Sequence, residues 1–145
     1  QLTQKGNLFY KLAGFEDIKF YQDSSSIPLE NIDIITAYAS IGYAPDWKLE
    51  MQKLLDFRPK HFIINRAHLT EEKSFLTRQV LQRDESYPLW FINQEEFIAT
   101  FQDLYTPTNQ ETTILGEAQW EFIGYPDQIN TDALRVMTDF VFERV

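Results

Sequence analysis

Two polar side chains follow an apolar run that is typical of a buried strand. The run is His61–Asn65, and Arg66 and His68 come after it. Ligands of open α/β sheets bind outside the carboxyl ends of strands, so both side chains lie where a substrate would bind. Arg66 could grip a carboxylate or phosphate through paired hydrogen bonds, and a surface ion pair is the alternative. His68 could act as a general base near neutral pH, and a loop histidine without a chemical role is the alternative.

A second polar group lies at the end of the apolar run Ile32–Ile41. By the same rule, Ser40 and Tyr43 would offer hydroxyl groups to a substrate there. A strand end followed by a capped helix is the alternative interpretation. Trp90 would form a wall on the substrate side of the site, and core packing is its alternative. These patterns leave the catalytic residues themselves unassigned.

The same two apolar runs flank an amphipathic helix. Apolar side chains recur within residues 46–57 at the spacing of a one-faced helix, and Asp46 can cap its first turn. A strand, a helix and a second strand form a parallel crossover unit. The run Ile32–Ile41 is nearly all apolar or small, which predicts a central parallel strand buried on both faces. The sequence therefore predicts an α/β fold.

Further elements are predicted on both sides of this unit. They are a helix at 3–14, a strand at 18–21, a helix from Thr70 to about Leu81, a loop at 84–88, an extended segment at 89–92, a helix that begins at the capping box Asn93–Glu96, and strands at 112–115, 119–123 and 136–145. A helix from Asp132 is the alternative to the last strand. No repeat interrupts the pattern, so residues 1–145 are predicted to form a single domain.

The composition argues against several classes of function. The 145 residues carry a net charge of −9, which disfavours binding to nucleic acid. The absence of cysteine excludes thiolate metal sites, and the 2 histidines lack metal-ligand spacing, so we expect no metal. No apolar run is long enough to cross a membrane and no signal peptide is visible, so we expect a cytoplasmic protein without a membrane partner. The chain begins at Gln1 without an initiator methionine, which suggests a fragment.

Three short motifs precede and enter the run Ile32–Ile41. They are Gln22-Asp23-Ser24, Ile27-Pro28 and Asp33-Ile34-Ile35. This pattern resembles class I S-adenosylmethionine-dependent methyltransferases. The resemblance implies that Asp23 accepts a hydrogen bond from the adenine amine of S-adenosylmethionine (SAM), and that Ser24 offers its backbone N–H to the adenine ring. A polar turn without a ligand is the alternative for both residues.

A further resemblance is to a bacterial family whose members are known only as predicted methyltransferases. It covers about residues 5–105, and its cues are Ala39–Tyr43, Ile63–Arg66, Arg78–Val80 and Ser86–Ile92. The chain departs from the family in two places, because the first strand with its glycine-rich turn and the acidic residue of the second strand are missing. The resemblance therefore implies a Rossmann-like methyltransferase sheet that lacks its first strands, seen as the C-terminal portion of the enzyme.

Two functions are weighed on this basis. The first is a SAM-dependent methyltransferase that holds its cofactor in line with a small-molecule or sugar acceptor, since approximation supplies much of the rate of such a reaction. The second is a non-catalytic Rossmann-like α/β module that serves in dimerisation or partner binding, because an exposed sheet edge favours pairing with another chain. Either function is compatible with a homo-oligomer.

Overall fold

The computed structural model describes residues 2–14, 17–22, 24–28, 32–82, 85–114, 121–124, 126–127 and 136–145. The chain divides into two compact units, Gln1–Glu30 and Asn31–Val145, and each is described by itself. The prediction of a single domain stays a prediction.

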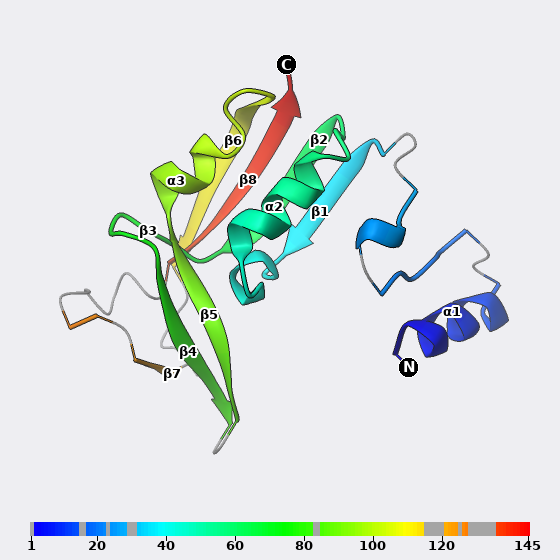
Figure 1. Cartoon of the computed structure of the whole chain (residues 1–145), viewed down its shortest axis with the longest axis horizontal. Coiled ribbons are helices and arrows are strands. Elements are labelled where there is room, and N and C mark those ends of the chain that lie inside the picture. The colour runs from blue at the N-terminus through cyan, green and yellow to red at the C-terminus, as the bar shows by residue number, and fades with distance from the viewer. Residues whose placement is uncertain are drawn as a thin grey trace. The chain divides into compact units, whose positions relative to one another are not determined.

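The first unit contains helix α1 (Leu2–Leu12) and the short 3-10 helix η1 (Ser24–Ser26) (Figure 1). Helix α1 confirms the helix predicted at 3–14. The strand predicted at 18–21 is wrong, because these residues are irregular. Phe20 explains the difference: its N–H donates to Asn7 Oδ1 at 2.7 Å and its carbonyl accepts from Asn7 Nδ2 at 3.0 Å. A side chain thus satisfies the backbone groups that a sheet partner would otherwise take.

The larger sheet of the second unit has the strand order β1-β2-β8-β6. Its strands are β1 (Ile34–Tyr38), β2 (His61–Ala67), β8 (Val136–Arg144) and β6 (Tyr105–Ile114). Strands β1 and β2 are parallel, whereas β8 runs antiparallel to both β2 and β6. Helix α2 (Trp47–Leu55) connects β1 to β2, so the predicted crossover unit is confirmed.

Strand β1 differs from the prediction in its burial. The sequence predicts a central strand buried on both faces, and this is wrong. Within the described residues β1 pairs with β2 alone, so it is an edge strand. Its side chains alternate accordingly: Ala37 is buried, whereas Ile34 is 52% exposed and Tyr38 is 64% exposed. A nearly continuous apolar run therefore did not distinguish an edge strand from a central one.

Helices α2 and α3 (Gln94–Ala99) cover one face of this sheet (Figure 1). The Asp46 carboxylate accepts the N–H of Leu49 at 3.0 Å, and Asn93 caps α3 by accepting from Glu96 N at 2.9 Å. Both helix starts are as predicted. Between the helices and the sheet lies an aromatic core, whose fully buried members include Phe62, Phe97, Phe101, Phe140 and Phe142.

A smaller sheet projects from this core, with the strand order β3-β5-β4-β7. Its strands are β3 (Leu69–Thr70), β5 (Glu85–Asn93), β4 (Phe75–Gln82) and β7 (Glu121–Ile123). The helix predicted from Thr70 to about Leu81 is wrong, as is the loop at 84–88 where β5 begins. In β4 the buried positions include the polar residues Thr77, at 2% exposure, and Gln79, at 0%. These polar residues hid the alternation that marks a strand.

The predicted tail strands at 112–115, 119–123 and 136–145 correspond to β6, β7 and β8, so strands in these regions are confirmed. The alternative helix from Asp132 is excluded for residues 136–144, because these residues form strand β8. Asp132 itself lies outside the described residues. No helix among the residues that the structure describes is long and apolar enough to span a membrane.

We predict that Phe62→Ala destabilises the fold strongly. Phe62 is fully buried, and its ring meets those of Phe101 and Tyr105 edge-on at centroid distances of 5.4 and 5.1 Å. Removing it leaves a cavity at the centre of the core, so the free energy of unfolding should fall by about 3–5 kcal/mol in urea unfolding. Leu76→Ala is the control, because Leu76 is 48% exposed. Equal losses in the two variants would contradict the position of this core.

Candidate functional site

The carboxyl ends of β1 and β2 lie side by side and share an unusual backbone feature. Tyr38 pairs with Asn65 in the parallel register. The residues that follow Tyr38 and Asn65 both have a positive φ, of 46° at Ala39 and 56° at Arg66. A left-handed backbone costs a residue with a side chain roughly 1–2 kcal/mol. Such strain is concentrated at functional sites, and here it occurs at two adjacent strand ends where ligands of α/β sheets bind.

A β-bulge in β2 places Arg66 at this point. The register of β2 with β8 passes from Ile64 opposite Phe140 to Ala67 opposite Thr138, so Asn65 and Arg66 together face Asp139. Asp139 Oδ1 accepts the backbone N–H of Arg66 at 2.6 Å. A carboxylate thus satisfies an amide that the bulge removes from the ladder. Bulges next to sites of function re-aim a side chain, and this one turns Arg66 out of the strand alternation.

The Arg66 side chain lies against Tyr38. Its Nη1 donates to the Tyr38 hydroxyl at 2.8 Å, and the guanidinium carbon lies 5.5 Å from the centre of the Tyr38 ring. This distance is within the range of a cation–π interaction. The pair borders an open cavity of about 270 Å³, lined by Tyr38, Arg66, Thr113, Met137 and Asp139. The site therefore combines a guanidinium, a phenol, an alcohol and a carboxylate.

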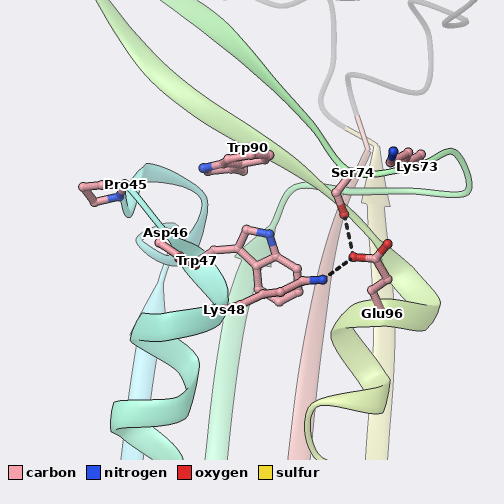
Figure 2. A pocket seen from close by; sticks show the side chains of 8 residues that line it. All are labelled: Pro45, Asp46, Trp47, Lys48, Lys73, Ser74, Trp90 and Glu96. Carbon is pink, nitrogen blue, oxygen red and sulfur yellow. Dashed lines mark hydrogen bonds and ion pairs between the residues drawn. The ribbon is translucent and has the colours of Figure 1, made fainter.

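A second cavity, of about 330 Å³, lies at the first turns of α2 and α3. Figure 2 shows the indoles of Trp47 and Trp90 at its sides and the chain of contacts along its rim. Lys48 Nζ lies 3.0 Å from Glu96 Oε2, which also accepts from Ser74 Oγ at 3.3 Å. The hydrogen bond from Lys48 holds the pKa of the Glu96 carboxyl below its ordinary value. Glu96 is therefore ionised at neutral pH.

Trp90 lines this second cavity, and its role as a wall on the substrate side stays a prediction. Its Nε1 is buried and has no hydrogen-bond partner among the described residues. A buried indole N–H without an acceptor costs about 1–3 kcal/mol, so this donor is a second unusual feature at the same end of the sheet. The neighbour of Trp90 across the cavity is Trp47, which is buried at 3% exposure.

Ser40 precedes the 3-10 helix η2 (Ile41–Tyr43), which follows β1, and Tyr43 is the last residue of η2. Ser40 precedes it without a capping bond from its side chain. The Tyr43 hydroxyl donates to Gln79 Oε1 of β4, and burial raises the pKa of Tyr43. Gly42 permits the close approach of β5, since a Cβ there would lie 2.8 Å from Leu89 Cδ1. Gln79 was missed because a buried glutamine in a strand has no signal in the sequence.

His68 lies in the core and not at the surface of the site. It is 3% exposed, and its ring meets Phe91 edge-on at 5.2 Å. Burial, with a smaller contribution from the charge of Arg66, lowers the pKa of His68 to about 4. The imidazole is therefore neutral at pH 7. This placement favours a structural histidine over a general base.

The structure brings only some of the predicted residues together. Asp23 lies outside the described residues, and Ser24 begins η1 in the first unit. Ser40, Tyr43, Arg66 and Trp90 belong to the second unit. Ser40, Tyr43 and Arg66 lie at or beyond the carboxyl ends of β1 and β2, whereas Trp90 lies within β5. Among the residues described, no group of three His, Asp or Glu side chains is arranged to hold a metal ion.

The solved structures that resemble the chain include two of one protein domain. No protein-family model and no curated protein sequence matches it. The first structure is the N-terminal domain of EvdMO1 with SAH bound, with a TM-score of 0.53 and 7% identity over 99% of this chain. The second is the same domain in the presence of SAH and D-fucose, with a TM-score of 0.53 and 8% identity over 99% of this chain. The chain spans 60% and 61% of those chains. The likeness shows the fold, and the predicted Rossmann-like α/β class is confirmed.

We predict that His68 makes stability depend on pH. Its pKa is about 4 in the folded chain against an ordinary 6.5, so the unfolded chain binds the proton more readily. The stability that His68 contributes is therefore complete above pH 6.5 and is lost as the pH falls toward 4. Between pH 7 and pH 4.5 the wild type should lose roughly 2 kcal/mol more than His68→Gln in urea unfolding. An NMR titration that gives His68 a pKa near 6.5 would contradict its burial.

Proposed function

We propose that the chain forms part of a SAM-dependent methyltransferase that acts on a small-molecule or sugar acceptor. One observation carries the proposal: the fold matches, over 99% of the chain, a domain solved with SAH bound. SAH is S-adenosylhomocysteine, the compound that remains when SAM has given up its methyl group. The backbone strain at the ends of β1 and β2 and the two cavities near these ends support the same function, because ligands of α/β folds bind at this position.

Asp23 and Ser24 are proposed to hold the adenine of the cofactor. Asp23 would accept the exocyclic N–H of adenine, and Ser24 would offer a backbone N–H to the ring. Both assignments rest on the motif that precedes β1. SAM would supply the methyl group: an O–CH3 bond to an acceptor hydroxyl would form as the S–CH3 bond breaks to leave SAH, and the hydroxyl proton would pass to solvent.

Ser40, Tyr43, Arg66 and Trp90 are proposed to contact the acceptor, with His68 supporting them from the core. The cavity beside Trp90 suits a sugar, because one indole face offers an apolar surface to a ring. The polar rim of Ser74, Glu96 and Lys48 can exchange hydrogen bonds with hydroxyl groups. These residues bind and orient the acceptor, and orientation is a large part of what a methyl transfer requires.

We predict that SAH binds this chain with micromolar affinity in isothermal titration calorimetry. Asp23→Ala should weaken the binding at least about tenfold, since a hydrogen bond to a charged group contributes about 1.5–3 kcal/mol. Asp17→Ala is the matched control, because it removes an exposed carboxylate of the first unit outside the motif. Equal affinities for wild type and Asp23→Ala would overturn the adenine assignment alone.

The same titration on a longer chain, extended by any residues that precede Gln1 in the gene, completes the test, because the chain spans 60% of the SAH-bound domain that it resembles. Binding only in the longer chain would place part of the cofactor site upstream and keep the proposal. The absence of SAH binding in both chains would refute it.

The exposure of β1 favours one alternative, a non-catalytic module for dimerisation or partner binding. Among the described residues β1 pairs on one side only, and Ile34 and Tyr38 are largely exposed. An edge strand of this kind can add a strand from another chain. Self-association in light scattering without any binding of SAH would support the module over the enzyme.

A further inference from the structure

Arg66 has an unusual electrostatic setting for a cation of an acidic chain. The sequence carries a net charge of −9, yet the ion pairs among the described residues involve Lys48, Lys53 and Lys60 and not Arg66. The surface ion pair considered for Arg66 is therefore not formed within the described part of the chain. A guanidinium has five N–H donors, and among the described residues only the Tyr38 hydroxyl accepts from one of them.

The contacts of Arg66 fix its direction and leave its charge accessible. The bulge and the bond to Asp139 hold the backbone, while the Tyr38 ring and hydroxyl hold the guanidinium. The Tyr38 oxygen accepts from Arg66, and no acceptor for its own O–H lies among the described residues. Two donors of different type thus border a cavity of about 270 Å³.

We infer that Arg66 and Tyr38 form a subsite for an anionic group of the acceptor, a carboxylate or a phosphate. A guanidinium binds either group through two parallel N–H bonds, and the phenol adds a third donor. The inference that this group belongs to the acceptor rests on the proposed function. The anion site itself rests only on the cavity and its contacts.

Asp139 is a positioning residue in this subsite. It accepts the Arg66 backbone N–H at 2.6 Å and lines the same cavity, so its negative charge also faces the ligand. Asp139 repels a dianion more than a monoanion, and Arg66 also attracts it more strongly. The charges alone therefore predict no preference, and separate titrations with a carboxylate and with phosphate distinguish the two sources of anionic charge.

The left-handed backbone of Arg66 provides a variant that removes the side chain without harming the fold. At a φ of 56° a glycine is unstrained, so Arg66→Gly takes away the guanidinium and relieves the backbone at once. Its melting temperature should equal or exceed that of the wild type. Arg66→Lys retains the charge but not the planar fork. Arg78→Gln is the matched control, because Arg78 is an exposed arginine of β4 that does not line this cavity.

The experiment is an NMR titration of the ¹⁵N-labelled chain with acetate and, separately, inorganic phosphate at constant ionic strength. We expect saturable shifts at Arg66 and Tyr38 in the wild type and in Arg78→Gln. Binding should weaken roughly tenfold in Arg66→Gly and by a smaller factor in Arg66→Lys. Equal binding by wild type and Arg66→Gly, or a linear response without saturation, would overturn the anion site.

A parallel titration with SAH separates this inference from the proposed function. Unchanged SAH affinity in Arg66→Gly supports the assignment of the subsite to the acceptor. Loss of SAH affinity in that variant would overturn the assignment, because the anion bound would then be the carboxylate of the cofactor. Saturable acetate binding without SAH binding in any form of the chain would retain the anion site and refute the methyltransferase.

Discussion

Strand β2 is the element on which the candidate site depends, because it is paired on both sides. Its parallel partner β1 brings Tyr38, 28 residues away in sequence, to Arg66. Its antiparallel partner β8 brings Asp139, 73 residues away, to the same residue. A slip of one residue in either register would turn one of these side chains to the opposite face. Phe62 of β2 lies opposite Ile35 of β1 and Phe142 of β8, so its burial between them supports both registers and with them the site.

Periodicity was sufficient for the elements whose buried positions are apolar. Trp47, Met51 and Leu55 define helix α2, and its crossover between β1 and β2 follows from chain order. Strand β4 was mistaken for a helix because two of its buried positions are Thr77 and Gln79. These residues are buried beside β5 and β7, and the Thr77 hydroxyl donates to the Ile123 carbonyl at 2.8 Å. Contacts with β5 and β7 therefore determine that β4 is a strand, and the local sequence pattern carries no information about these contacts.

The rule that ligands bind at strand ends located the site but not all of its members. It indicated Arg66 because the residue follows an apolar run. Tyr38 was overlooked because it lies within such a run, and its exposure depends on β1 being an edge strand. Asp139 was overlooked because only the register of β8 shows that a bulge faces it. Residues that hold a functional side chain from a distant strand are thus the hardest to find in a single sequence.

Three described residues other than glycine have a positive φ, and they are Ala39, Arg58 and Arg66. Arg58 precedes β2, whereas the two at the strand ends, Ala39 and Arg66, differ in what explains them. A glycine would adopt the backbone of Ala39 or Arg66 without the steric penalty that a side chain brings. At Arg66 the penalty is offset by contacts that only its side chain makes, on the Tyr38 ring and hydroxyl. At Ala39 the backbone N–H donates to the Asn65 carbonyl at 2.8 Å, which joins the two strand ends, but nothing in the structure requires its methyl group. The strain at Ala39 thus follows from the turn of the chain, whereas the strain at Arg66 accompanies a side chain aimed at a cavity. A strained backbone is evidence of function only where the side chain itself is needed, and Arg66 meets that condition.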